Sequence, residues 1–148
     1  MILIAHRGNI YGPNPARENS PVYIGEALDK GFSVEVDVWY DGTDFWLGHD
    51  SPTYKIQESF LMNSNIWCHA KNLGSLQKML TNHDIHCFWH QVDDYTVTSR
   101  GYIWAYPGKN VGKNTICVMP EATETPSLIN SCLGICSDFI EKYRKKMY

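Results

Sequence analysis

Short apolar stretches recur along this chain, and clusters of turn residues separate them. β-Branched and aromatic residues dominate these stretches, and such residues favour β-strands. The strands that this pattern predicts cover residues 2–5, 32–40, 45–49, 66–70, 86–90, 95–99, 101–106, 115–119 and 134–139. A chain with this many short strands has to fold around a sheet.

Helical patterns lie between several of these stretches. The clearest covers residues 20–31, where Ser20 can cap a helix, Pro21 suits its first turn and Gly31 ends it. Strands that alternate with short helices predict a parallel sheet with crossover connections. A full TIM barrel takes about 250 residues, and this chain has 148. We therefore predict one α/β domain over residues 1–148, a small, trimmed TIM-type (β/α) barrel with several outer helices shortened or missing.

The composition excludes some classes of protein. The net charge is −3, so a basic surface for nucleic acid is not expected. No apolar run reaches the length of a membrane span, and "MILIA" is too short for the core of a signal peptide. The five cysteines form no CxxC motif, which favours free thiols in a reducing compartment over a disulfide or a zinc site. We expect a cytoplasmic protein.

The stretch "VEVDVW", residues 34–39, places two carboxylates in an otherwise apolar strand. Alternate side chains of a strand share a face, so Glu35 and Asp37 lie on one face and the valines on the other. Two like charges on a buried face repel each other and are costly to desolvate. A bound cation removes that penalty; ion pairs with Arg7 or Lys71 are the alternative.

Further polar clusters stand at the ends of predicted strands: "HRG" at 6–8, "GHD" at 48–50 and "HAK" at 69–71. In a parallel barrel, the carboxyl ends of the strands form the active face. A single histidine at a strand end is more often a structural group than a functional one. The order and the spacing of the clusters therefore carry more weight than any one of them.

Together these clusters resemble one known family. "IAHRGN", "ENS", "VEVDVW", "WLGHD" and a closing "GICSDF" follow the order found in the glycerophosphodiester phosphodiesterases, which belong to the wider group that includes phosphatidylinositol-specific phospholipase C. The resemblance is strongest over residues 2–50. It implies metal-dependent hydrolysis of a phosphodiester.

The resemblance also implies roles for individual residues. His6 and His49 would be the acid–base pair, Glu35 and Asp37 would hold a divalent cation, and Arg7 would contact phosphate. The chemistry of these residue types is consistent with the implied roles, since carboxylate oxygens suit Mg²⁺ or Ca²⁺ and paired imidazoles can accept and donate protons. Lys71 can act as a further point charge on phosphate. Asn19 belongs to the loop beside the site and is a candidate for the substrate-contacting rim.

One position departs from the family pattern. The family carries an acidic metal ligand two residues before the lysine, where this chain has His69. Either His69 binds the metal, which shifts the preference toward Mn²⁺ or Zn²⁺, or another acid completes the site. Glu121 is the first candidate for that acid and Asp94 is the second.

Three more residues are candidates for a substrate-contacting rim. His90 lies in "HQVDD", which is as consistent with a capped loop as with a rim. Trp104 and Tyr106 precede "PG" and could stack on a glycerol face or on a choline-like cation, whereas most other aromatic residues are expected in the core.

We expect a phosphoric diester hydrolase that acts on a glycerophosphodiester or a related phospholipid-headgroup ester. Two alternatives remain at this stage: a phospholipase D-like lyase that forms a cyclic phosphate, and a phosphate- or headgroup-binding protein without turnover. A small phosphodiester is the expected partner, and a trimmed barrel with uncovered apolar wall would favour a homo-oligomer.

Overall fold

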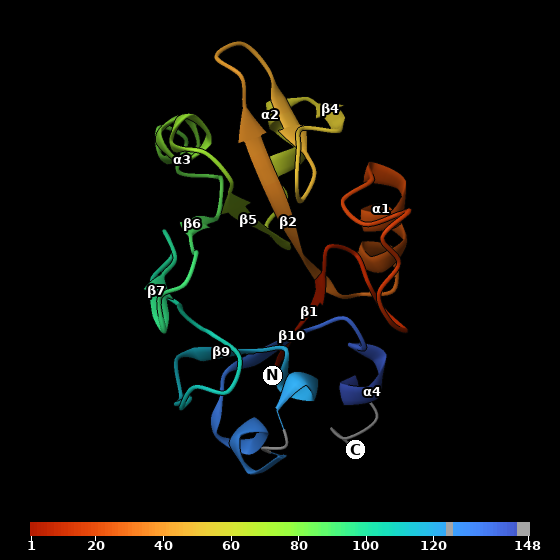
Figure 1. Ribbon diagram of the computed structural model, residues 1–148, viewed down its shortest axis with the longest axis vertical. Coiled ribbons are helices and arrows are strands. Elements are labelled where there is room, and N and C mark those ends of the chain that lie inside the picture. Colours follow the sequence, from red (N-terminus) through yellow and green to blue (C-terminus); the bar gives the residue numbers. More distant parts are fainter. Residues whose placement is uncertain (124–125, 145–148) are drawn as a thin grey trace.

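A computed structural model, which describes residues 1–123 and 126–144, shows a mixed sheet with short helices against it (Figure 1). The strands are β1 (Ile2–His6), β2 (Ser33–Tyr40), β3 (Phe45–Leu47), β4 (Tyr54–Ile56), β5 (Ile66–Ala70), β6 (Cys87–Trp89), β7 (Tyr95–Val97), β8 (Ile103–Ala105), β9 (Thr115–Val118) and β10 (Gly134–Ser137). The helices are α1 (Pro21–Asp29), α2 (Glu58–Leu61), α3 (Leu73–Leu80) and α4 (Glu141–Arg144), with 3₁₀ turns η1 (Pro120–Ala122) and η2 (Pro126–Ser131).

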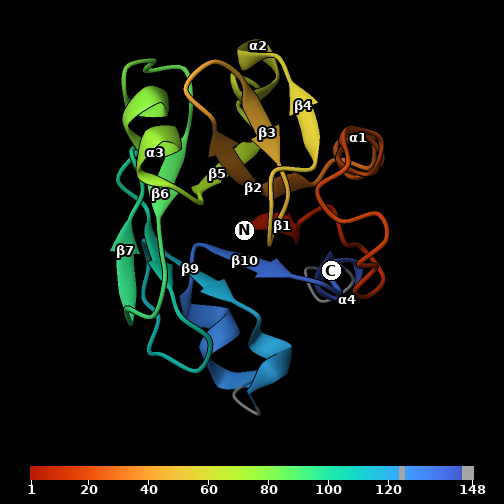
Figure 2. The same ribbon diagram turned by 45° about the horizontal axis from the view of Figure 1, so that its top comes forward.

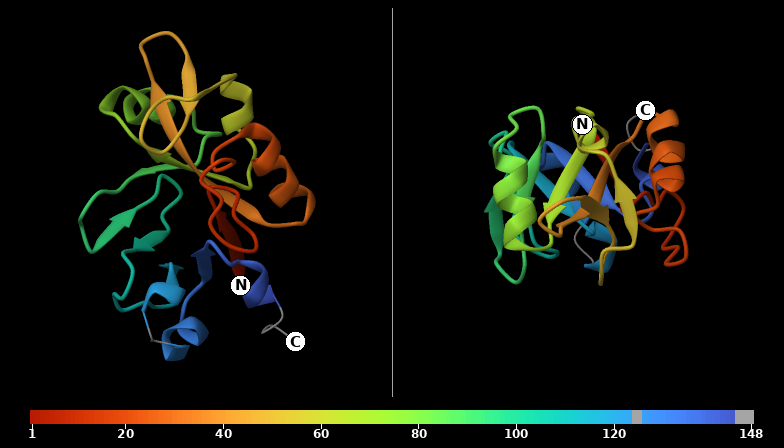
Figure 3. Two further views of the ribbon diagram at one scale, coloured as in Figure 1. Left: turned by 45° about the vertical axis from the view of Figure 1, so that its right-hand side comes forward. Right: turned by 90° about the horizontal axis from the view of Figure 1, so that it is seen from above.

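Seven of the strands run parallel to one another in the order β6-β5-β2-β1-β10-β9-β8. The other three strands are antiparallel additions. β3 pairs with the end of β2 and β4 pairs with β3, while β7 pairs with the edge of β8. The strands form an arc, with α1 and α3 outside it (Figures 1 and 3). The hairpin of β3 and β4 lies beside α2 (Figure 2).

The predicted trimmed TIM-type barrel is wrong, because the sheet does not close. All three residues of β8 pair with β9 on one side and with β7 on the other. The edge of β8 that would have to meet β6 is therefore occupied, and within the described chain β6 pairs only with β5. The connection from β6 to β8 is an antiparallel strand where a barrel would have a crossover helix.

Local sequence explains the two longest helices. Ser20 accepts a hydrogen bond from the Tyr23 N–H at the start of α1, where Pro21 occupies the first position. Asn72 and Ser75 form a reciprocal capping box at the start of α3. The Asn72 side chain also donates to the carbonyl of Tyr40 and so ties α3 to the end of β2.

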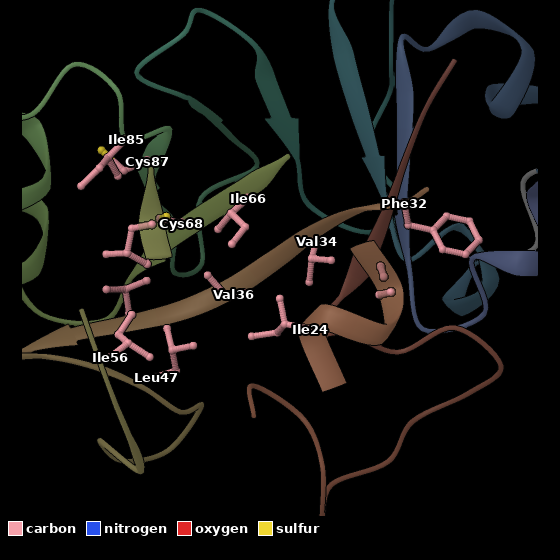
Figure 4. Packing of buried hydrophobic residues seen from close by; sticks show 14 of the residues in the cluster. Ile24, Phe32, Val34, Val36, Leu47, Ile56, Ile66, Cys68, Ile85 and Cys87 are labelled. Atoms are coloured by element: carbon pink, nitrogen blue, oxygen red, sulfur yellow. The ribbon is translucent and has the colours of Figure 1, made fainter. Parts of the chain in front are cut away.

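The larger apolar core lies on the outer face of the sheet. Val34, Val36 and Val38 of β2 are fully buried there, and they pack with residues from the neighbouring strands and helices. Figure 4 shows Val34 and Val36 among Ile24 of α1 and Ile66 of β5. This core fixes the position of β2, and β2 in turn positions the side chains on the inner face of the sheet.

A second apolar cluster fills part of the inner face. Trp67, Phe88, Trp104 and Ile116 belong to it, from β5, β6, β8 and β9. The rings of Phe88 and Trp104 lie 4.6 Å apart at their centroids, so side chains join β6 to β8, two strands that do not pair with each other in the described chain. Among the described residues, no helix has the length and apolar character needed to cross a membrane.

Candidate metal and phosphate site

Three metal-ligating side chains meet on the inner face of β2 and β5. Asp37 is paired with His69 in the parallel register of the two strands, and Glu35 lies one pleat earlier on the same face. One ligand atom from each of the three lies within 4.8 Å of the others. Glu35 and Asp37 are 2% and 1% exposed, so water does not solvate these charges. The predicted placement of the two carboxylates opposite the valines is confirmed.

Glu35 lacks a hydrogen-bond partner for one of its oxygens. Its buried Oε2 has none among the described residues, and His6 Nε2 lies 3.9 Å from it. A buried carboxylate oxygen without a donor is costly. A divalent cation beside Glu35 would remove that cost.

His69 is oriented so that one ring nitrogen faces the carboxylates. Its Nε2–H donates to the backbone carbonyl of His90 at 2.7 Å, which leaves Nδ1 at 3.2 Å from Asp37 and 3.6 Å from Glu35. Burial lowers the pKa of His69, but its hydrogen bonds to Asp37 and Glu35 outweigh burial and raise it to about 9. Metal-binding histidines are commonly held in this way, with the second nitrogen donating to a carbonyl.

Two cationic side chains approach the same carboxylate. Arg7 Nε lies 3.2 Å from Asp37 Oδ2, and Lys71 Nζ lies 3.6 Å from Asp37 Oδ1. Burial raises the pKa of Asp37, but His69, Arg7 and Lys71 together hold it well below its usual range. The ion-pair alternative is therefore correct for Asp37, while Glu35 forms no such pair with Arg7 or Lys71.

The loop after β1 holds Arg7 in an unusual backbone conformation. Arg7 has φ of 54° and Asn19 has φ of 63°, both in the left-handed region that glycine prefers. Backbone hydrogen bonds from Arg7 N to Glu35 O and from Asn19 N to Arg7 O fix this arrangement. The Asn19 side chain then donates to Asp37 and accepts from the Asp37 N–H, both at 2.9 Å. Strained residues of this kind cluster at functional sites.

His6 is the better oriented of the two predicted acid–base histidines. Its Nδ1–H donates to Asp138 Oδ1 at 2.7 Å, and its Nε2 faces Glu35. Burial lowers the pKa of His6, but the hydrogen bond to Asp138 and the charge of Glu35 outweigh burial, so the pKa is raised. An imidazole held by a carboxylate on one nitrogen presents the other nitrogen in a fixed direction.

His49 is less constrained. Its side chain is 42% exposed, and its hydrogen bond goes to the neighbouring Asp50, which is 93% exposed. His49 nevertheless lines the same cavity as His6.

Two cavities meet at this site. The first, which we call the inner cavity, has a volume of about 400 Å³ and includes His6, Glu35, His69, Lys71 and Tyr106 in its wall. The second, the outer cavity, measures about 330 Å³ and is bounded by the loops around residues 15–19 and 48–54. Arg7 and His49 line both.

The predicted rim residues lie around the inner cavity, but in different environments. Trp104 is 3% exposed and belongs to the inner apolar cluster, whereas Tyr106 is 42% exposed. His90 is held by Asp93, to which its Nδ1–H donates at 2.8 Å, and its ring lies beside that of Tyr106. Asp93 also accepts a hydrogen bond from the Gln91 N–H. Asp93 therefore caps this loop, as in the second of the two interpretations that the sequence allowed for "HQVDD".

The two acids proposed as substitutes for the missing ligand lie elsewhere. Glu121 accepts hydrogen bonds from the Ser137 hydroxyl, the Asp138 N–H and the Tyr143 hydroxyl, so it fixes the loop after β10. Asp94 forms an ion pair with Lys109 at 2.8 Å. Of the two possibilities left open by the sequence, the described residues favour His69 as the third ligand.

Sequence reasoning missed two polar residues that build the site. Asp138 holds His6, and Asn9 joins Asp138 to Glu18 through its side-chain amide, with both distances 2.8 Å. The signal was present in "HRGN" and in "SD" after the last strand, but these segments are far apart in the sequence. Only the pairing of β1 with β10 shows that they meet.

Comparison with protein-family models, characterised proteins and solved structures found no match to this chain.

Proposed function

We propose that this protein is a metal-dependent phosphodiesterase acting on a small glycerophosphodiester or a related phospholipid-headgroup ester. One observation carries the proposal: the buried Glu35–Asp37–His69 cluster borders the inner cavity through Glu35 and His69, and two cationic side chains and an oriented imidazole line the same cavity. Anion-binding and cation-binding groups in one cavity suit a phosphate bound beside a metal ion.

The three ligand residues fit a divalent cation. Glu35 has a buried oxygen without a donor, and His69 offers Nδ1 on the same side. Two carboxylates with one imidazole suit Mn²⁺ or Zn²⁺ as well as Mg²⁺, because imidazole is softer than carboxylate. When bound, the cation would supply positive charge to a non-bridging phosphate oxygen.

The chain's own cations would complete phosphate binding. Arg7 has a buried Nε without a hydrogen-bond partner in the described residues, and its planar guanidinium can grip two oxygens at once. Lys71, only 18% exposed, adds a point charge from the neighbouring strand. A phosphate would thus replace the present contacts of both residues with Asp37.

His6 would handle a proton in the reaction. Water attacks phosphorus, one P–O ester bond breaks, the proton of the water passes to one imidazole, and the departing alkoxide takes a proton from the other. The hydrogen bond from His6 to Asp138 keeps its Nε2 directed into the cavity. General acid–base catalysis of this kind contributes typically about 10²–10⁴-fold in rate.

Binding without turnover is the second candidate, and the exposure of His49 favours it. Because the hydrogen bond that the described residues give His49 goes to an exposed neighbour, the second proton-transfer group is less constrained than His6. Turnover by the wild-type protein separates the two candidates, and His6→Ala and His49→Ala then test whether these histidines carry the turnover.

The test is hydrolysis of glycerophosphodiesters with Mg²⁺, Ca²⁺, Mn²⁺ or Zn²⁺, followed by phosphorus NMR. We expect a phosphomonoester product, loss of turnover in both histidine variants, and retained phosphate binding. A cyclic phosphate product would assign a lyase. Ligand binding without turnover in the wild type with all four metals would assign a binding protein.

A further inference from the structure

Besides the metal-ligating His69, three imidazoles line the inner cavity, and they belong to His6, His49 and His90. His6 and His49 have roles in the proposed reaction, whereas His90, which directly follows β6, has none. What His90 can do there rests on the proposed function for the positions of the metal ligands and the phosphate.

His90 is held in the same way as His6. Its Nδ1–H donates to Asp93 at 2.8 Å, just as that of His6 donates to Asp138 at 2.7 Å. The His90 side chain is only 10% exposed, and its Nε2 has no hydrogen-bond partner among the described residues. An imidazole that a carboxylate holds through Nδ1 keeps Nε2 available to exchange a proton with a substrate.

The loop that carries His90 is tied to its surroundings at both ends. The His90 carbonyl accepts from His69 Nε2–H at 2.7 Å, which joins the start of the loop to β5. At the other end, the Asp94 carbonyl accepts from the Tyr106 N–H at 2.9 Å, and the Asp94 side chain forms its ion pair with Lys109. The antiparallel connection through β7 therefore holds His90 in the cavity wall.

His6 and His90 stand on opposite sides of the metal ligands. The strands follow one another in the order β6-β5-β2-β1 (Figure 1), and the ligands lie on the middle two. His6 ends β1 and His90 follows β6, so these two histidines flank the cluster. His49 has neither position, because it belongs to the loop between β3 and β4 and its side chain is exposed.

Hydrolysis of a phosphodiester needs a proton transfer on each side of phosphorus. The attacking water and the departing alcohol stand roughly in line through phosphorus. The base takes the proton that water loses, the ester P–O bond breaks, and the acid gives its proton to the departing alkoxide. Exchange with solvent restores both groups. Two imidazoles on opposite sides of a phosphate beside the metal ligands suit these two roles.

We infer that His90 is a further catalytic residue and forms the proton-transfer pair with His6. His49, which lines both cavities together with Arg7, then contacts the phosphate. Asp93 is the positioning residue of His90, as Asp138 is of His6.

The test compares two leaving groups, because p-nitrophenolate departs without a proton whereas the alkoxide of a glycerophosphodiester needs one. In His90→Gln, which keeps a polar side chain of similar size, kcat for the glycerophosphodiester should fall about 10²–10⁴-fold, with KM nearly unchanged. In the variant that lacks the acid, either His6→Ala or His90→Gln, the p-nitrophenyl ester should lose at least about tenfold less. His49→Ala should lower turnover of both esters by the same factor.

His90→Ala provides a second measurement. Added imidazole should raise its turnover by at least about tenfold, because the inner cavity, with its volume of about 400 Å³, has room for this molecule. A merely structural role for His90 would not give this rescue. His83→Ala, which removes an exposed imidazole that lines neither cavity, is the matched control and should keep wild-type turnover.

Turnover of both His90 variants within about threefold of the wild type would overturn the inference. So would a loss that raises KM and resists imidazole, which marks a binding residue, or a leaving-group difference that appears in His49→Ala instead. Failure of the proposed function looks different, since the wild type would then hydrolyse neither ester, and the role of His90 would fall with it.

Discussion

On its outer face β2 presents three fully buried valines, whereas on its inner face it presents two buried carboxylates. Val36 and its neighbours pack in the larger core, where the burial of apolar side chains favours folding. Glu35 has a buried oxygen without a donor, and Asp37 is surrounded by cations. The two faces of this strand therefore have different roles. The outer face stabilises the fold, and the inner face holds charges that only a ligand fully satisfies.

The largest effect expected from this comparison is on the inner face. Glu35→Gln keeps the shape of the side chain but removes one ligand charge, so divalent metal binding and turnover should fall together. The loss of turnover should be about 10³-fold or more, because a catalytic metal ion contributes several kcal/mol to the transition state. Steady-state kinetics measures this loss. Unfolding of the metal-free protein should change by less than about 1 kcal/mol, and a larger destabilisation would show that Glu35 is a structural residue.

The matched change on the outer face is Ile66→Ala, in the strand beside β2. Ile66 is 1% exposed and belongs to the larger core. Removing its side chain should lower the free energy of unfolding by roughly 2–5 kcal/mol. Denaturant titration measures this, and metal affinity of the folded variant should match the wild type. A strong loss of metal affinity would mean that the two faces are not independent.

A smaller effect is expected on the stability of the fold at low pH, and it arises from a histidine in the apolar part of the inner face. His86 is 1% exposed and packs against Trp67, and burial together with Arg100 lowers its pKa from 6.5 to about 4. The unfolded chain therefore binds a proton that the folded chain does not, and stability falls as the pH drops from about 6.5 toward 4. His86→Gln, which can still bond Thr98, should reduce the loss between pH 7 and 4.5 by about 2 kcal/mol. Equal pH profiles of unfolding for both proteins would contradict this account.

The smallest effect concerns Asp138, the partner of His6. Asp138→Asn removes a negative charge that raises the pKa of His6 against the effect of burial. The limb of the pH–rate profile that belongs to His6 should move to lower pH by up to about one unit, with little change in KM. Asp50→Asn is the control, because it removes the carboxylate beside the exposed His49 and leaves the one beside His6 in place. A profile unchanged in Asp138→Asn would mean that His6 does not transfer the proton.

The sequence was sufficient for the local parts of this structure. The alternation in "VEVDVW" correctly predicted which side chains share a face, and Ser20 and Pro21 correctly marked the start of α1. These features depend on neighbouring residues, whose geometry is fixed by the period of a strand or a helix. The departure at His69 was also visible, and the structure places its Nδ1 beside both carboxylates.

The features that failed depend on pairing between distant segments. Closure of the predicted barrel was excluded by β7, whose three residues take the free edge of β8. Glu121 was one of two acids that could have replaced His69 as a ligand, and it instead accepts hydrogen bonds from Ser137 and Tyr143. Asp138 was overlooked because it lies 132 residues from His6. No local pattern encodes such contacts, since they follow from sheet topology.

The measurement that tests the central claim most directly is calorimetric titration of the metal-free protein with Mn²⁺ and Zn²⁺ in two buffers of different ionisation enthalpy. At pH 7.5 His69 carries a proton, because its pKa is raised to about 9, and a metal must displace that proton from Nδ1. We predict one ion per chain, release of about one proton, and loss of both in Glu35→Gln. Absence of binding by either ion, or binding that releases no proton and survives the substitution, would contradict a metal site at Glu35, Asp37 and His69.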